Sequence, residues 1–135
     1  MSDADTRPLL FDSHTFIWAM TQPERLPAAT RMIASDPGRV ILLSTASIWE
    51  IASKVGRGRW PEAAAPLHDL DATLVRAGIT VLPVSSQHAR AAGLLEWAHR
   101  DPFDRMLAAQ AQIEGAILVT ADRAYAGLPL AVMWN

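Results

Sequence analysis

The sequence predicts a single α/β domain, a three-layer α/β/α sandwich with a mainly parallel central sheet. Short apolar runs typical of strands alternate with longer segments of helical periodicity, and strands separated by helices form parallel sheets covered on both faces. Half of the 135 residues are hydrophobic, which is enough for one core. We find no internal repeat or linker, so residues 1–135 are expected to form one domain with a loose tail over residues 1–6.

Strands and helices are expected to alternate along most of the chain. The expected strands are residues 8–12, 40–43, 79–84 and 117–122, with a short edge strand at 130–134. The expected helices are residues 14–20, 27–36, 46–55, 67–77, 86–97 and 102–114.

Boundary residues support the elements of the first half. Pro23 breaks the first helix, and Pro27 suits the first turn of the second. Ser44 offers an N-cap to the third helix, whose apolar residues keep the helical period until Gly56 stops it. Trp60 then opens a loop before the fourth helix.

Similar signals define the second half. Gly78 is a typical helix terminator before the third strand, and Ser85 or Ser86 caps the helix that follows. Asp101 at the N-cap and Pro102 at the first position form a good start for the last helix, which ends at a second terminator glycine.

Composition excludes several kinds of protein. The chain has no cysteine, which rules out disulfides, thiolate zinc sites and a cysteine nucleophile and suits a reducing compartment. The acidic N-terminus lacks the features of a signal peptide, and no apolar run is long enough to span a membrane, so we expect a soluble, cytoplasmic protein. A net charge of −2 provides no broad basic field, so any nucleic acid must be held locally.

Four acidic residues are candidates for one site. Asp12 and Asp122 end two strands, and ligands of open α/β sheets bind beyond the carboxyl ends of strands. Between them, predicted helices supply Glu50 and Asp104. Clustered carboxylates raise one another's pKa or bind a cation, and hard ions such as Mg²⁺ prefer carboxylate oxygen and water.

Local structural roles account for some of the acids but not for Asp104. Asp12 and Asp101 suit helix caps, and capping alone accounts for Asp101. Asp104 shares its helix face with apolar residues and is expected to face inward, where a carboxylate needs a partner. Glu50 lies nearly opposite the apolar stripe of its helix and precedes Lys54 at the spacing of a surface ion pair, so local pattern predicts exposure to solvent.

Basic and aromatic residues give weaker signals. Lys54, the only lysine, is followed closely by Arg57 and Arg59, which either grip a phosphate backbone or are solvated helix ends. The histidines have no zinc-site spacing and receive no role; they are His14, His68, His88 and His99. Most tryptophans are expected in the core, whereas exposure of Trp18 or Trp60 would mark a partner surface.

Two phosphate-handling enzymes are disfavoured as alternatives. A receiver domain needs a lysine late in the chain, and an aspartate-nucleophile phosphatase needs a second aspartate where His14 stands. The chain also lacks a glycine-rich loop after the first strand, which argues against dinucleotide or Walker-type nucleotide binding.

Four motifs together resemble the PIN-domain family (PilT N-terminus), close to the toxin ribonucleases of VapBC-type toxin–antitoxin systems. The motifs are Leu9-Leu10-Phe11-Asp12-Ser13-His14-Thr15, Ser47-Ile48-Trp49-Glu50-Ile51-Ala52, Asp101-Pro102-Phe103-Asp104-Arg105-Met106-Leu107-Ala108-Ala109-Gln110-Ala111 and Leu118-Val119-Thr120-Ala121-Asp122. They occur in order, at family-like spacing, over nearly the whole chain.

The resemblance implies a metal-dependent endoribonuclease that hydrolyses RNA phosphodiester bonds, the toxin of a toxin–antitoxin pair. It places Asp12, Glu50, Asp104 and Asp122 at a catalytic Mg²⁺ or Mn²⁺ site and so opposes the local prediction for Glu50. It also implies supporting hydroxyls at Ser13 and Thr120, a cognate antitoxin and a homodimer. The alternative is a non-catalytic PIN-fold module that binds other proteins, because fold alone does not fix function.

Overall fold

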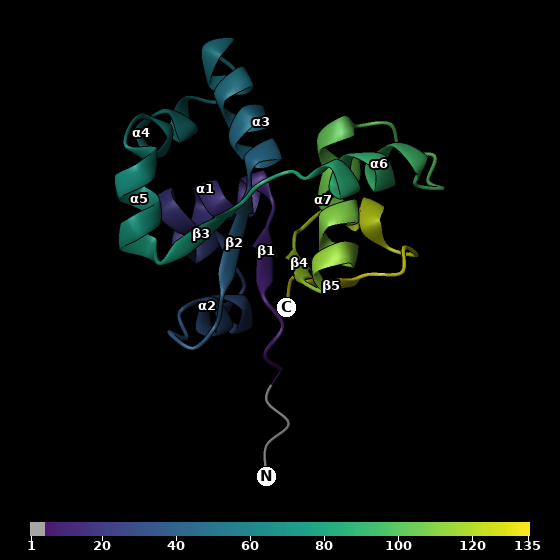
Figure 1. The fold of residues 1–135 in the computed structure, drawn as a ribbon. Helices are drawn as coiled ribbons and strands as arrows, with labels where there is room; N and C mark the ends of the chain where they lie inside the picture. The colour runs from purple at the N-terminus through teal and green to yellow at the C-terminus, as the bar shows by residue number, and fades with distance from the viewer. Residues whose placement is uncertain (1–4) are drawn as a thin grey trace.

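The computed structural model describes residues 5–135, which are built around a sheet of five parallel strands (Figure 1). The strands are β1 (Leu9–Phe11), β2 (Ile41–Ser44), β3 (Ile79–Leu82), β4 (Ile117–Val119) and β5 (Ala131–Met133). They lie in the order β3-β2-β1-β4-β5, and every neighbouring pair is parallel. The predicted parallel sheet and its C-terminal edge strand are confirmed. Residues 1–4 of the expected tail lie outside the described residues.

Helices and short 3-10 turns connect the strands. The helices are α1 (Ser13–Thr21), α2 (Ala28–Ala34), α3 (Thr45–Gly56), α4 (Ala64–His68), α5 (Leu70–Ala77), α6 (Ser86–Leu94) and α7 (Pro102–Glu114). The 3-10 turns are η1 (Pro23–Arg25), η2 (Pro61–Ala63) and η3 (Arg123–Tyr125). Within residues 5–135, every helix is too short or too polar to cross a membrane.

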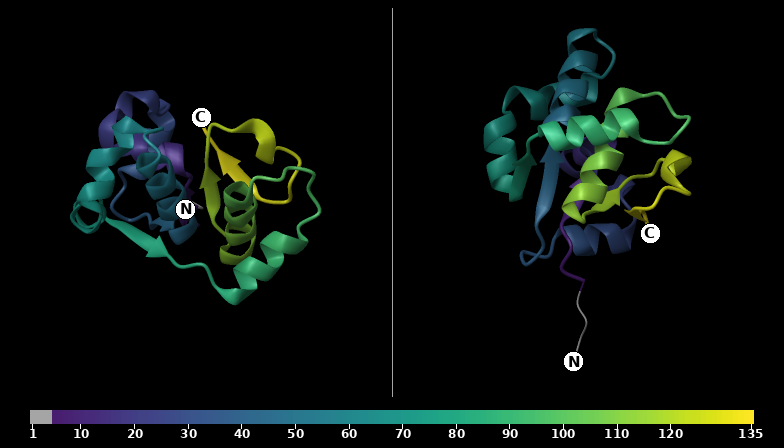
Figure 2. Two further views of the ribbon diagram at one scale, coloured as in Figure 1. Left: turned by 90° about the horizontal axis from the view of Figure 1, so that it is seen from above. Right: turned by 45° about the vertical axis from the view of Figure 1, so that its right-hand side comes forward.

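The sheet carries a hydrophobic core on each face, because successive residues of a strand point to opposite sides. In β1, Leu9 and Phe11 pack with residues of α1, α3 and α5, whereas Leu10 packs with residues of α7. Figure 1 shows α6 and α7 on the opposite side of β1 from α4 and α5, and the view from above in Figure 2 shows the same division. The predicted three-layer α/β/α sandwich is confirmed.

Two elements that lie beside a proline differ from the prediction. The helix expected over residues 67–77 is two helices separated at Asp69. The first of them begins early enough to hold Pro66 in its first turn, where the missing N–H costs no helical hydrogen bond. The third strand is shorter than expected and ends at Leu82, because Pro83 has no N–H with which to continue the ladder.

A side chain from another helix explains the early end of α6. The helix stops at Leu94 rather than reaching Trp97. The guanidinium of Arg105 donates to the carbonyls of Ala92 (3.1 Å) and Leu95 (2.6 Å). Arg105 therefore satisfies carbonyl groups that another helical turn would otherwise pair, and local sequence around residue 95 gives no sign of it.

Candidate functional site

The four candidate acids lie beyond the carboxyl ends of the central strands and line one cavity of about 450 Å³. Asp12 directly follows β1, and Asp122 follows β4 after a short turn. Glu50 lies on α3, the helix after β2, and Asp104 lies in the first turn of α7. The structure therefore brings all four side chains to a shared pocket, while their roles in metal binding and catalysis stay predictions.

Asp12 is held by both of its carboxylate oxygens. Oδ1 accepts the backbone N–H of Thr15 at 2.8 Å, which caps α1, and Oδ2 accepts the hydroxyl of Thr120 at 2.5 Å. The capping interpretation is thus correct, and the supporting hydroxyl at Thr120 is confirmed. Each oxygen accepts one hydrogen bond here and can accept a second, so Asp12 is oriented but not saturated.

Glu50 is buried, and the local prediction that it faces solvent was wrong. The residue is 9% exposed. Its Oε1 accepts the hydroxyl of Ser13 at 2.5 Å, and its Oε2 lies 3.0 Å from Nζ of Lys54. The hydrophobic periodicity of α3 reflects only the face that packs on the sheet, whereas α1 and α7 also pack against this helix. Their contact covers the polar flank that carries Glu50.

Asp104 faces inward, as its apolar helical neighbours predicted. Nε2 of His99 lies 2.7 Å from Oδ2, and the hydroxyl of Tyr125 donates to Oδ1 at 3.1 Å. Burial raises the pKa of the Asp104 carboxyl above its ordinary value of 3.8, although the bonds from His99 and Tyr125 act in the opposite direction. Burial, with Asp104 nearby, also raises the pKa of the Tyr125 phenol, which keeps it a donor.

Two further acids have simpler surroundings. Asp101 caps α7, because its Oδ1 accepts the backbone N–H groups of Phe103 (2.9 Å) and Asp104 (3.1 Å). It also lines the cavity, so the capping interpretation is correct without describing its whole environment. Asp122 is exposed and caps the 3-10 turn η3, and its own N–H donates to the Thr120 hydroxyl at 3.0 Å.

Sequence reasoning missed the two side chains that hold Asp104. His99 received no role, and its only signal is that it precedes the cap of α7 closely enough to fold back over the first turn. Its ring stacks on Trp97 with centroids 4.6 Å apart. Tyr125 gives no local signal, because tertiary folding alone brings it to Asp104.

The tryptophans are divided between the core and the surface. Trp60 is 8% exposed and belongs to the core on the α1 side of the sheet, which agrees with the expectation that most tryptophans lie in the core. Trp49 is 67% exposed, beside Glu50 in the sequence, and its ring meets Phe103 edge-on at 5.1 Å. An aromatic pair, of which Trp49 is exposed and Phe103 half-buried, therefore lies where α3 and α7 meet near the cavity.

The chemistry of the cavity suits a hard divalent cation. Five carboxyl groups line it, those of the four candidate acids and Asp101, against the single ammonium of Lys54. Within residues 5–135, no three His, Asp or Glu side chains converge closely enough to form a ready-made metal site. Mg²⁺ commonly binds through one or two carboxylates with waters completing its octahedron, so the donors present fit it without such convergence.

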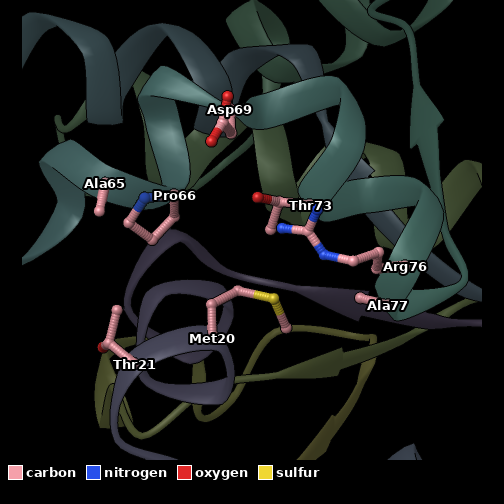
Figure 3. A pocket seen from close by; sticks show the side chains of 8 residues that line it. All are labelled: Met20, Thr21, Ala65, Pro66, Asp69, Thr73, Arg76 and Ala77. Carbon is pink, nitrogen blue, oxygen red and sulfur yellow. The ribbon is translucent and has the colours of Figure 1, made fainter.

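A second cavity, of about 470 Å³, differs in character. It lies between the end of α1 and the helices α4 and α5, with Met20 facing Thr73 and Arg76 (Figure 3). Of the residues that line it, only Asp69 is acidic. The concentration of carboxylates is therefore a property of the cavity above the central strands.

Comparison with known proteins agrees with the fold. The model of the PIN domain family matches residues 9–129, a span that includes all four candidate acids. No curated protein sequence matches the chain. Three solved structures resemble this chain. For each of them, the first coverage value is the share of this chain and the second is the share of the other chain. VapBC2 from Rickettsia felis, bound to a promoter DNA fragment, has a TM-score of 0.68, 18% identity and coverage of 94% and 98%.

A toxin–antitoxin complex from Klebsiella pneumoniae has a TM-score of 0.62, 19% identity and coverage of 93% and 95%. FitAcB from Neisseria gonorrhoeae has a TM-score of 0.64, 16% identity and coverage of 93% and 96%. At these identities the solved structures establish a common fold over nearly the whole length of each chain. Together with the family match across most of the sequence, they show that this chain belongs to the PIN domain family.

Proposed function

We propose that this protein is a metal-dependent endoribonuclease and the toxin of a toxin–antitoxin pair. One observation carries the proposal: Asp12, Glu50, Asp104 and Asp122, from four separate parts of the chain, line a single cavity. Burying acids together is unfavourable unless a cation or another partner offsets their repulsion. Lys54 balances only one of them, which leaves the cavity strongly negative.

Hydrogen bonds hold three of the four acids in place. Thr120 and the Thr15 amide fix Asp12, and Ser13 fixes Glu50. His99 and Tyr125 fix Asp104. These three acids are thereby oriented to hold Mg²⁺ or Mn²⁺, directly or through water, with Asp122 nearer the opening. When bound, the ion supplies a water of lowered pKa and neutralises charge that develops on the phosphorus of an RNA phosphodiester.

Substitution of the acids tests the nuclease. Asp12→Asn and Asp104→Asn remove charge with little change of shape, so cleavage of a panel of structured RNAs with Mn²⁺ should fall about 100-fold or more. Asp71→Asn is the matched control, because Asp71 is an exposed acid on α5 away from the cavity. Circular dichroism checks folding, and isothermal titration measures Mn²⁺ binding independently of cleavage. If wild-type protein binds no Mn²⁺ and leaves every RNA intact, so that it does not differ from Asp12→Asn, the result would favour the protein-binding alternative.

We infer that the protein partner is an antitoxin. The solved structures from Klebsiella pneumoniae and Rickettsia felis are described as a toxin–antitoxin complex and as VapBC2, which supports a partner of this class. The exposed Trp49 beside Phe103 offers apolar surface next to the acid cavity, which a basic side chain of the partner could enter.

Expression of this chain alone should arrest growth, and co-expression with the neighbouring gene's product should restore it. Harmless expression would contradict the toxin assignment, and light scattering tests the expected homodimer.

A further inference from the structure

A cationic hollow lies beside the acid cavity. It has a volume of about 260 Å³ and is lined by His14, Lys54, Arg57, Arg59 and Trp60. His14 and Lys54 also line the acid cavity, so the two hollows share a wall. We propose that this cationic hollow is a subsite for the RNA backbone, which holds phosphates next to the bond that is cut. This proposal rests on the proposed nuclease function.

The end of α3 fixes where the two arginines lie. The N–H of Arg59 donates to the carbonyl of Lys54 and the N–H of Gly58 to that of Val55, both at 2.9 Å. This pair of bonds, with Gly58 at a φ of +69°, is the Schellman arrangement that ends many helices. Arg57 and Arg59 are therefore held on either side of a defined turn, on the helix that carries Glu50.

The side chains of the two arginines are available to a ligand. Both are exposed, and within residues 5–135 neither forms an ion pair or a side-chain hydrogen bond. By contrast, Arg105 is occupied by backbone carbonyls and Arg7 by Asp5. Guanidinium groups without protein partners, placed at the rim of a hollow, are suited to bidentate contacts with phosphate.

Lys54 and His14 connect this rim to the acids. Nζ of Lys54 lies 3.0 Å from the Glu50 carboxylate and 5.4 Å from the centre of the Trp60 ring. The ring of exposed His14 lies 4.6 Å from that of Trp60, which is itself buried and forms the floor. A nucleic acid strand that leaves the acid cavity by this wall therefore meets positive charge at once.

Charge complementarity favours RNA over an acidic peptide as the occupant. The hollow shares a wall with a cavity lined by five carboxyl groups, which would repel the carboxylates of a peptide that followed the same path. A phosphodiester chain is also anionic, but the proposed reaction brings it there with a divalent cation. Because the net charge of the chain is −2, these cations provide a local attraction that the protein as a whole does not.

Binding without cleavage tests the subsite. A fluorescein-labelled single-stranded RNA oligonucleotide is titrated with wild-type protein and with Arg57→Gln/Arg59→Gln in Ca²⁺, a divalent cation that carboxylates bind in place of Mg²⁺. Anisotropy is read at several salt concentrations, and gel electrophoresis verifies that the RNA remains intact. The double variant should bind roughly 3- to 10-fold more weakly, and the slope of log K against log salt should fall by about 1.4, which corresponds to two phosphate contacts on a single strand. Arg31→Gln/Arg90→Gln removes the same charge from exposed positions on α2 and α6 and should leave both quantities near the wild-type values.

The outcomes separate this subsite from the nuclease. Equal RNA binding by the two double variants would overturn the subsite even if wild-type protein cleaves RNA. Loss of RNA binding in Arg57→Gln/Arg59→Gln, with no cleavage by wild-type protein and Mn²⁺, would refute the nuclease and leave the hollow as an RNA-binding site. A polyglutamate peptide that displaces the RNA at equal or lower concentration would overturn the assignment in favour of an acidic protein partner.

Discussion

Removal of the Arg105 guanidinium is expected to loosen the segment between α6 and α7. This side chain donates hydrogen bonds of 2.6 to 3.1 Å to four backbone carbonyls, those of Ala92, Leu95, Trp97 and His99. Residues 95–101 have no helix or strand of their own. The guanidinium therefore replaces the backbone hydrogen bonds that secondary structure supplies elsewhere.

The number of bonds sets the size of the effect. A hydrogen bond from a charged donor contributes about 1.5–3 kcal/mol where its acceptor is buried, and less where water can replace it. The segment is partly exposed, so we count two of the four bonds as lost and expect Arg105→Ala to lower the free energy of unfolding by about 3 kcal/mol. Arg105→Lys keeps the charge but lacks the planar fork, and roughly half of this loss is expected.

Urea unfolding followed by circular dichroism measures the change. Arg90→Ala on the exposed side of α6 is the control and should change the free energy of unfolding by less than about 0.5 kcal/mol. Amide exchange in residues 95–100 should accelerate in Arg105→Ala more than exchange in the sheet. If the free energy of unfolding of Arg105→Ala lies within about 1 kcal/mol of the wild-type value, water solvates these carbonyls at little cost and the reasoning fails.

Two further predictions follow from the local geometry. Burial raises the pKa of Asp104, so its contribution to stability is fully present below the ordinary pKa of 3.8 and is lost as pH rises through the folded-state pKa. Urea titrations from about pH 3 to pH 7 should show Asp104→Asn gaining stability relative to wild type as pH increases, and a constant difference would contradict the shifted pKa. Gly58→Ala forces a side chain into a φ of +69° and should cost about 1 kcal/mol, whereas Gly56→Ala, in helical conformation with open space at Cβ, should gain about 0.5–1 kcal/mol. Thermal unfolding compares the two, and equal effects would show that the helix end adapts.

Features that depend on the chain within one turn of a residue were predictable. The caps at Ser44 and Asp101 and the end at Gly78 all lie where the sequence places them. The strand-terminal acids Asp12 and Asp122 were also readable, because strand direction alone decides which edge of a parallel sheet they occupy. The early end of α6 was not, because its cause, Arg105, lies beyond the loop that it holds.

Glu50 shows why one of the four candidate acids escaped local reasoning. A helix that covers a parallel sheet has an apolar stripe toward the sheet, and residues off this stripe read as solvent-facing. At the carboxyl edge of the sheet, however, neighbouring helices also converge, and the flanks of α3 meet α1 and α7. A polar residue on such a flank faces a pocket and finds partners such as Ser13 and Lys54. Periodicity therefore predicts exposure for a helical position such as Glu50, which lies off the apolar stripe, and only the contacts between helices reveal that it belongs to the site.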